Sequence, residues 1–93
     1  MKVRIRFFAR FRELLGSEIM EEITKGTSLA ELVRIIALRR SREGYDALFD
    51  RGGTFHPFVI IMRNGVRLSP PEAEHVQVSE GDDIAIFPPV AGG

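Results

Sequence analysis

The chain has 93 residues, no cysteine and a formal net charge of zero, because 13 lysines and arginines balance 13 aspartates and glutamates. This length predicts one domain with a single modest core, and the neutral charge argues against electrostatically driven binding of nucleic acid. The absence of cysteine excludes disulfides, thiolate zinc sites and cysteine nucleophiles.

The N-terminal part of the chain predicts two strands joined by a short helix. Apolar side chains alternate with basic or aromatic ones over residues 2–9, which is the period of a half-buried strand. Residues 11–15 fit a helical turn or short helix that ends at Gly16. Residues 18–23 favour a strand that returns beside the first, although their pattern also fits a helix.

The clearest helix follows Ser28. Ser28 and Glu31 form a capping-box pattern, and Thr27 is a competing N-cap. The apolar residues that follow recur at the spacing of one helix face, and they are Leu29, Leu32, Val33, Ile36 and Ala37.

The middle of the chain predicts a second short helix and then a hairpin. The short helix covers residues 45–49, and we expect its Leu48 and Phe49 to form a satellite cluster over the core. Residues 57–63 predict a strand that is covered on both faces, because apolar residues fall on both of its faces. Asn64-Gly65 is the strongest two-residue hairpin signal in the sequence.

The last third of the chain predicts a return strand, a loop and a final strand. The return strand covers residues 66–68 and stops at a Ser-Pro-Pro break. Residues 72–79 are interpreted as a loop or a short irregular segment, which a glycine-containing turn follows. The final strand covers residues 83–87, with Ile84 and Ile86 pointing inward.

This order of elements predicts an α+β fold in which one main helix packs across one face of a mixed sheet. The ubiquitin-like β-grasp has the same order, with its first and last strands parallel and adjacent at the centre of the sheet. The charges are compatible with that pairing, because residues 1–12 carry only basic charges and residues 69–93 carry acidic side chains and no lysine or arginine. We predict a β-grasp domain over residues 1–87 and an extended reactive tail over residues 88–93.

The end of the sequence has the composition of a slim, stiff tail. Pro88 disfavours helical angles at Phe87 and so ends the last strand, and two successive prolines favour extended polyproline geometry. Glycine has no side chain, so a Gly-Gly end fits a narrow cleft in another protein. We predict that the reactive group is the carboxylate of Gly93 and that the residues threading into a partner are Pro88, Pro89, Val90, Ala91 and Gly92.

The sequence shows no catalytic or metal-binding constellation. His56 and His75 lack the spacing of a metal site and are interpreted as partly exposed loop residues. Gly52-Gly53 lacks the lysine of a phosphate-binding loop, so we do not expect the chain to activate its own carboxylate with ATP. Asp82-Asp83 is interpreted as a pair of turn residues. We predict a protein that is not an enzyme and that holds no metal or cofactor.

Two aromatic and two basic residues are candidates for a partner interface. If the last strand buries its isoleucines, Phe87 points to the opposite face, and the alternation of the first strand places Phe8 on that face as well. An apolar patch rimmed by arginines at the root of the tail favours a protein interface, and a loop covering the rings is the alternative. Arg4 and Arg6 share this face, either as part of the interface or as a solvated sheet surface.

Targeting and membrane segments are not expected. The N-terminal residues alternate between charged and apolar types, which is unlike a signal peptide. The longest strongly apolar run, residues 58–62, is far too short to span a membrane. We therefore predict a cytoplasmic protein with no membrane partner.

Three stretches carry a resemblance to a known family. They are residues 3–16, the helix over residues 28–37, and residues 81–93, which end in Phe-Pro-Pro-Val-Ala-Gly-Gly. On these motifs the sequence resembles the MoaD-type small sulfur-carrier subunits of molybdopterin synthase, within the ThiS/MoaD ubiquitin-like superfamily. Thiamine-pathway carriers, which it resembles less, are usually shorter and lack the proline pair. Residues 39–57 look like extra length, and we attach no function to them.

The resemblance implies a sulfur carrier in the biosynthesis of molybdopterin, for a molybdenum or a tungsten cofactor. An adenylating partner similar to ubiquitin-activating enzymes would use ATP and magnesium on the Gly93 carboxylate, and a sulfur donor would then convert it to a thiocarboxylate. The loaded tail would enter the large, catalytic subunit of molybdopterin synthase and donate sulfur to a pterin precursor. One alternative is a ubiquitin-like modifier joined through Gly93 to target lysines, and another is an interaction domain with an unused tail.

Overall fold

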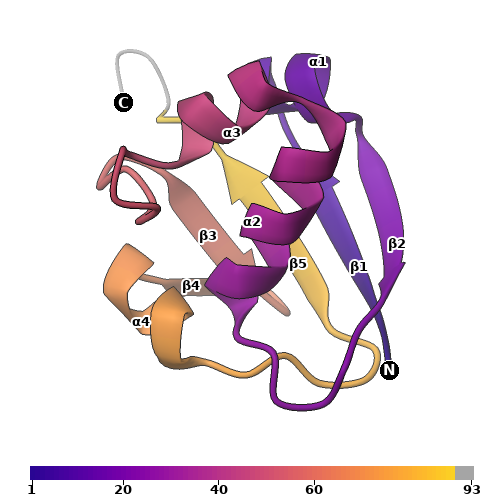
Figure 1. The fold of residues 1–93 in the computed structure, drawn as a ribbon. Coiled ribbons are helices and arrows are strands. Elements are labelled where there is room, and N and C mark those ends of the chain that lie inside the picture. Colours follow the sequence, from indigo (N-terminus) through magenta and orange to yellow (C-terminus); the bar gives the residue numbers. More distant parts are fainter. Residues whose placement is uncertain (90–93) are drawn as a thin grey trace.

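The computed structural model describes residues 1–89, and Figure 1 shows how its helices and strands are arranged. In these residues, no helix combines the length and apolar character needed to cross a membrane. In chain order, the elements are β1 (Lys2–Phe7), α1 (Arg10–Leu15), β2 (Glu18–Glu22), α2 (Leu29–Arg40), α3 (Arg42–Leu48), β3 (Ile60–Arg63), β4 (Val66–Leu68), α4 (Pro70–His75) and β5 (Asp83–Phe87).

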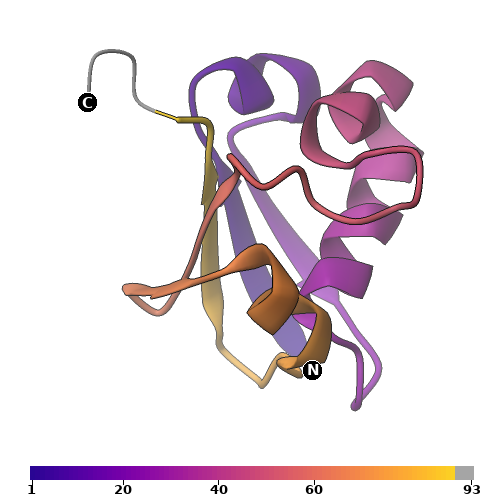
Figure 2. The same cartoon turned by 90° about the vertical axis from the view of Figure 1, so that its left-hand side faces the viewer.

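The strands form one five-stranded mixed sheet in the order β2-β1-β5-β3-β4. β1 and β5 lie parallel and adjacent in its middle, with Arg4 opposite Asp83 and Phe7 opposite Ile86. The other neighbouring strands are antiparallel. Figure 2 shows α2 and α3 on one side of the sheet. The structure therefore confirms the predicted β-grasp.

Helix α2 covers the inner face of the sheet, and Ser28 sets its start. The Ser28 hydroxyl oxygen accepts a hydrogen bond from the backbone nitrogen of Glu31 at 3.1 Å, which satisfies one of the unpaired donors at the helix start. Thr27 is not the cap, because its hydroxyl donates to the carbonyl oxygen of Thr24 at 2.7 Å. The predicted apolar faces of the helix and of the central strands are all buried: Val3, Ile5, Phe7, Leu29, Leu32, Val33, Ile36, Ala37, Ile84 and Ile86.

The predicted hairpin turn is present between β3 and β4. Asn64 and Gly65 have φ angles of 51° and 81°, the left-handed values that a tight two-residue hairpin turn requires. The hairpin places β4 at the edge of the sheet, with Leu68 opposite Ile61.

The loop predicted over residues 72–79 is wrong, because α4 occupies its first part. The Ser69 hydroxyl oxygen accepts a hydrogen bond from the backbone nitrogen of Glu72 at 3.2 Å, and the Glu72 carboxylate accepts one from the backbone nitrogen of Ser69 at 2.8 Å. This is a complete capping box. Pro70 at the first helical position starts the helix rather than preventing it.

Helix α3 is also longer and more central than the sequence predicted. It begins at Arg42 because the side chain of Ser41 accepts a hydrogen bond from the backbone nitrogen of Gly44 at 3.0 Å. Leu48 and Phe49 belong to the main core and not to a satellite cluster. The reason is that α3 packs against both α1 and α2, so that its apolar side faces the interior.

The strand predicted over residues 57–63 is shorter, and only one of its faces is covered. β3 begins at Ile60, and Phe58 before it is 49% exposed. Ile60 and Met62 are half-buried, whereas Ile61 is buried, because the helices of residues 1–89 lie on the side of Ile61. The opposite side, which we call the open face, carries alternate residues of each strand.

Candidate functional site

The root of the predicted tail lies on the open face, where two aromatic rings stack. Phe8 follows β1 and Phe87 ends β5, and the parallel pairing of these strands brings them together. The ring centroids are 4.3 Å apart and the ring planes differ by 13°. Both side chains remain partly exposed. The prediction that these two residues are neighbours is confirmed.

Arg4 and Arg6, the predicted basic rim, bind the same carboxylate. The Nη2 atom of Arg4 lies 3.0 Å from Oδ2 of Asp83, and Arg6 donates from Nε and Nη2 to both oxygens of Asp83 at 3.1 Å. The hydrogen bond from Arg4 is the main cause of a lowered pKa at Asp83; partial burial opposes it, and Arg6 adds to it. The two arginine side chains are 42% and 38% exposed, so they remain accessible to a partner.

Arg6 connects this ionic cluster to the aromatic pair. Its Cζ atom lies 5.6 Å from the centroid of the Phe8 ring, within the range of a cation–π interaction. Asp83, Arg6, Phe8 and Phe87 therefore form one continuous series of contacts that ends at the root of the tail.

The role of Asp83 was missed in the sequence, which suggested a turn residue. Asp83 is instead the first residue of β5, directly opposite Arg4. The β-grasp pairing itself contained the signal, because it places the acidic start of the last strand beside the basic first strand. Opposite charges on paired strands attract each other.

Asp82, the other predicted turn residue, is buried and anchors the start of β5. It is 5% exposed, and its carboxylate accepts hydrogen bonds from Asn64 Nδ2 at 2.9 Å, Arg63 Nε at 2.9 Å and the backbone nitrogen of Ser79 at 2.8 Å. Burial raises the pKa of Asp82, but these three hydrogen bonds outweigh it and the pKa is lowered. Asp82 thus ties the β3–β4 hairpin to the last strand.

Apolar side chains of β3 extend the aromatic pair across the sheet. Ile60 lies opposite Phe87, and Met62 lies opposite Ala85. Directly opposed residues of neighbouring strands point to the same face, so this strip continues from the stacked rings along the open face. An apolar strip bordered by charged side chains has the composition of a protein interface.

Only the first part of the predicted tail lies within the described residues. Pro88 is half-buried and Pro89 is exposed. Val90, Ala91, Gly92 and Gly93 lie outside the described residues, so their threading and reactive roles stay predictions.

The two histidines lie away from this site. His56 Nε2 is 3.0 Å from the carbonyl oxygen of Asp46, and His75 is the last residue of α4 and not a loop residue. Across residues 1–89, no group of three or more histidine, aspartate or glutamate residues could hold a metal ion. The site described here offers a surface for binding another protein.

Comparisons with known proteins place this architecture in a family. The model of the ThiS family matches residues 5–93. The small archaeal modifier protein 3 of Haloferax volcanii is 29% identical over 94 residues, covering all of both chains. The molybdopterin synthase sulfur carrier subunit of Aedes aegypti is 27% identical over 99 residues, covering all of this chain and 90% of that protein.

Solved structures agree with the fold. The crystal structure of the small archaeal modifier protein 1 of Haloferax volcanii superposes with a TM-score of 0.80 and 22% identity over the whole of both chains, a likeness that supports the fold alone. A complex of subunits 1 and 2 of the molybdopterin-converting factor from Helicobacter pylori contains a chain that matches with a TM-score of 0.61 and 26% identity, again over the whole of both chains.

Proposed function

This chain belongs to the ThiS family of small sulfur carriers and ubiquitin-like modifiers, and we propose that within it the chain acts as the sulfur carrier of a molybdopterin synthase. In this role the chain is the non-catalytic subunit, and its reagent is the carboxyl group of Gly93. The observation that supports the proposal most directly is the match along its full length to a molybdopterin synthase sulfur carrier subunit. The stacked Phe8 and Phe87 at the root of the tail support the proposal, because a partly exposed aromatic pair has the composition of a protein interface.

The proposed chemistry follows from the properties of a carboxylate, which is a poor acyl donor. A carboxylate oxygen of Gly93 attacks the α-phosphorus of ATP, bound with magnesium by an adenylating partner, and pyrophosphate leaves. The sulfur donor then supplies hydrosulfide, whose sulfur attacks the carbonyl carbon. The bond from this carbon to AMP breaks, AMP leaves with the bonding electron pair, the sulfur loses its proton, and a thiocarboxylate remains. Because the sequence has no cysteine, Gly93 is the position on this route where the chain can hold sulfur covalently.

The chain's own residues contribute binding and orientation. We propose that Phe8, Phe87, Arg4 and Arg6 contact the large, catalytic subunit of the synthase, while Pro88 to Gly93 enter its active site. In the Helicobacter pylori complex, a chain similar to this one is bound to a second subunit of a molybdopterin-converting factor. The pterin precursor would then receive sulfur from the thiocarboxylate in a cavity of the partner.

A second candidate function is protein modification. The small archaeal modifier protein 3, which matches along its whole length at 29% identity, favours it. In this case the amine of a target lysine, rather than a sulfur nucleophile, attacks the activated carbonyl of Gly93, and an isopeptide bond forms.

The intact mass of the protein purified from the cells that produce it separates these candidates. A sulfur carrier should yield a species in which one carboxyl oxygen is replaced by sulfur, whereas a modifier should yield conjugates that contain a lysine of another protein. A population consisting only of the free acid and of conjugates would contradict the proposed sulfur-carrier role.

Removal of Gly93 tests the reactive end directly. Deleting this residue, or adding one after it, should abolish sulfur loading and leave the circular dichroism spectrum unchanged, because Gly93 lies beyond the last strand of the domain. Full sulfur transfer by the shortened chain would contradict the proposal.

A further inference from the structure

The turn between β3 and β4 contains the only asparagine of the sequence, Asn64, and Gly65 follows it directly. In a chain that is free to move, the backbone nitrogen of the next residue attacks the side-chain carbonyl carbon of an asparagine and expels ammonia. Glycine in the next position leaves this nitrogen unhindered, because it has no side chain. The dipeptide that makes the tight turn is therefore also a chemically reactive pair.

The folded chain holds the Asn64 amide away from this reaction. Its Nδ2 atom donates to Oδ1 of Asp82 at 2.9 Å, and its Oδ1 atom accepts from the backbone nitrogen of Asp83 at 2.8 Å. The backbone nitrogen of Asn64 also donates to the carbonyl oxygen of Asp83 at 2.8 Å. Attack by the Gly65 nitrogen requires the side-chain amide to turn onto its own main chain, so both side-chain hydrogen bonds must break first.

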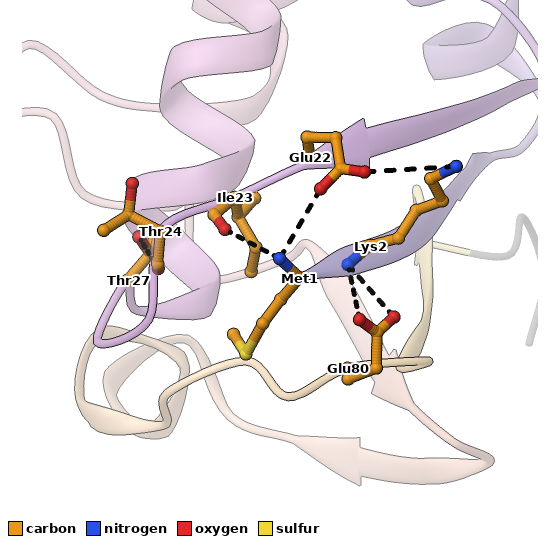
Figure 3. Close-up of polar contacts among 7 residues, drawn as sticks. All are labelled: Met1, Lys2, Glu22, Ile23, Thr24, Thr27 and Glu80. Atoms are coloured by element: carbon orange, nitrogen blue, oxygen red, sulfur yellow. Dashed lines mark hydrogen bonds and ion pairs between the residues drawn. The ribbon is translucent and has the colours of Figure 1, made fainter.

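The segment that carries Asp82 is fastened to the centre of the sheet. The backbone nitrogen of Lys2 donates to both carboxylate oxygens of Glu80 at 3.2 and 3.1 Å, as Figure 3 shows. The backbone nitrogen of Gly81 donates to the carbonyl oxygen of Lys2 at 2.8 Å. Asp82 itself accepts a hydrogen bond from the backbone nitrogen of Ser79 at 2.8 Å. When Asn64 and Asp82 separate, we therefore expect the hairpin to be the part that moves.

The hairpin between β3 and β4 has few buried contacts of its own. Its second strand, β4, has three residues and lies at the edge of the sheet, and Val66 in it is 64% exposed. Figure 2 shows the hairpin projecting from the sheet on the side away from α2. Arg63 adds hydrogen bonds from the hairpin to Oδ2 of Asp82 at 2.9 Å and to the Ser79 hydroxyl oxygen at 3.3 Å. Segments of this kind open locally at a lower free energy than the whole fold.

We propose that Asn64 is a modification site of this chain, at which local opening of the β3–β4 hairpin permits deamidation. The backbone nitrogen of Gly65, after losing its proton to hydroxide, attacks Cγ of Asn64 and forms a carbon–nitrogen bond. The bond from Cγ to Nδ2 breaks, and ammonia leaves with the bonding electron pair and a proton from water. The product is a cyclic imide. The proposal is independent of the proposed activation of Gly93.

Water then opens the ring of the imide in one of two ways. Addition of water at Cγ breaks the new carbon–nitrogen bond and gives aspartate at residue 64. Addition at the main-chain carbonyl carbon breaks the original peptide bond and gives isoaspartate, so that the main chain continues through the side chain. In both cases one water is consumed and one ammonia is released overall.

Neither product fits the closed hairpin. An aspartate places a carboxylate oxygen opposite Oδ1 of Asp82, in place of the Nδ2 donor that lies 2.9 Å away. Like charges so close repel each other, so one carboxylate must take up a proton or move. An isoaspartate adds a methylene group to the main chain of a tight turn. Deamidation therefore makes an opening of the hairpin irreversible.

The rate of modification at Asn64 is measured by peptide mapping with mass spectrometry in mildly alkaline buffer, with enzymatic methyl labelling to detect isoaspartate. The other side-chain amide of the sequence, Gln77, should stay unmodified because its longer side chain cyclises more slowly. We expect the folded chain to react at least about tenfold more slowly than the chain unfolded in urea, a difference of about 1.4 kcal/mol or more. Below the unfolding transition, the rate should rise only slightly with urea, because a local opening exposes little surface.

Two variants separate local opening of the hairpin from unfolding of the whole chain. Asp82→Ala removes the acceptor of the Asn64 amide and should raise the rate in the folded chain by about tenfold or more. Gly44→Ala is the matched control, because its Cβ atom would lie 2.5 Å from Cδ2 of Leu15 and so disturbs helix packing, while the contacts of Asn64 stay in place. Its rate at Asn64 should equal that of the unmodified chain.

Four results would overturn the proposal. They are equal rates in the folded and the urea-unfolded chain, a rate that rises with urea as steeply as the unfolding equilibrium, no acceleration in a folded Asp82→Ala variant, and equal acceleration in Asp82→Ala and Gly44→Ala. If Asp82→Ala does not fold, the urea dependence of the unmodified chain decides alone. None of these results depends on sulfur loading, so a failure of the proposed function would leave the assignment of Asn64 standing.

Discussion

Asp82 and Asp83 are adjacent in the sequence and perform two different tasks. Asp82 is buried and accepts hydrogen bonds from Arg63 and Asn64, which hold the β3–β4 hairpin against the start of β5, and a third from the backbone nitrogen of Ser79. Asp83 lies on the open face and binds both Arg4 and Arg6, and Arg6 lies beside the Phe8 ring. The period of two in a strand explains the difference, because neighbouring residues point to opposite faces.

These two carboxylates make stability dependent on pH in the acid range. Both carboxylates have a lowered pKa in the folded protein. The pKa of an aspartate in the unfolded chain is about 4. Their stabilisation is therefore complete above about pH 4 and is lost as the pH falls through the lower folded values. We expect Asp82→Asn to be less stable than the unmodified chain by about 2 kcal/mol at neutral pH, since it loses charge-assisted hydrogen bonds in a buried place.

The measurement is the difference in the free energy of unfolding between Asp82→Asn and the unmodified chain, from urea titrations at neutral pH and in acid. The difference should shrink in acid, because protonation of Asp82 removes the same charge that the variant lacks. A difference that stays constant down to the lowest pH at which the chain folds would contradict this account.

Phe87 is placed to contribute to partner binding more than to folding. It is half-buried on the open face and stacks on Phe8. We expect Phe87→Arg to weaken binding to the large synthase subunit by about 2 kcal/mol or more, as the loss of an aromatic anchor at the centre of an interface does. Isothermal titration calorimetry gives the affinity, and thermal unfolding gives the effect on the fold.

Phe58→Arg is the matched control for this prediction. Phe58 is also an exposed aromatic residue, but it precedes β3 and stacks on His56. Its substitution should leave affinity for the large subunit nearly unchanged. A large fall in melting temperature in Phe87→Arg, with unchanged affinity, would show that Phe87 acts as a core residue.

At the scale of elements, α3 shows how one missing side chain sets the packing of two helices. Gly44 of α3 is buried against Leu15 of α1. A Cβ atom at residue 44 would lie 2.5 Å from Cδ2 and 2.7 Å from Cγ of Leu15. The close approach of α1 and α3 therefore depends on glycine at this position.

Gly44→Ala should destabilise the chain, although alanine is the better helix former. The overlap with Leu15 costs about 1 to 3 kcal/mol when it forces neighbours to shift, and this exceeds the gain of roughly 1 kcal/mol in helix propensity. In a Leu15→Ala background, which removes the obstructing atoms, the same substitution should cost little. Urea unfolding of the four chains of this double-mutant cycle measures the coupling. Equal costs in both backgrounds would contradict the packing argument.

The elements that sequence reasoning predicted well are those with a local signal and a regular period. Alternation of apolar residues predicts the strand that buries Val3 and Ile5. A capping pattern predicts the helix after Ser28. Helix α4 was missed although its capping box, Ser69 to Glu72, is more complete than that of Ser28. Two successive prolines predict a break in a strand, but a proline directly after a capping residue starts a helix, as Pro70 does after Ser69.

Long-range contacts were the least accessible to sequence reasoning. The pairing of β1 with β5 followed from the order of the elements, and it correctly placed Phe8 beside Phe87. The shared carboxylate of Asp83 and the depth of Phe49 in the core depend on side-chain directions and helix packing that no local pattern contains.

At the scale of the whole molecule, the fold separates its surfaces along the length of the sheet. The open face and the root of the tail meet where β5 ends, near Phe8. The N-terminus, and the turn between β2 and α2 that carries Lys25, lie toward the other end (Figure 1).

The two prolines that follow β5 lead to the last prediction. Ordering a flexible backbone costs roughly 1 to 2 kcal/mol per residue, and proline has already lost part of that freedom before binding. Replacing Pro88 and Pro89 with Gly-Gly should therefore weaken insertion of the tail into a narrow channel by about tenfold or more. Stability should change little, because both positions lie beyond the last strand and Pro89 is exposed.

The affinity of this Gly-Gly variant should be measured separately for the activating enzyme and for the large synthase subunit, with the rate of sulfur transfer measured at saturation. If the prolines act by restricting the tail before it binds, affinity falls for both partners while the rate at saturation is kept, because the reacting carboxyl group of Gly93 is unchanged. The affinity of a Pro88→Ala, Pro89→Ala variant should lie between those of the unmodified chain and the Gly-Gly variant, since alanine restricts the backbone more than glycine and less than proline. Unchanged affinity for both partners would mean that the prolines serve only to end β5.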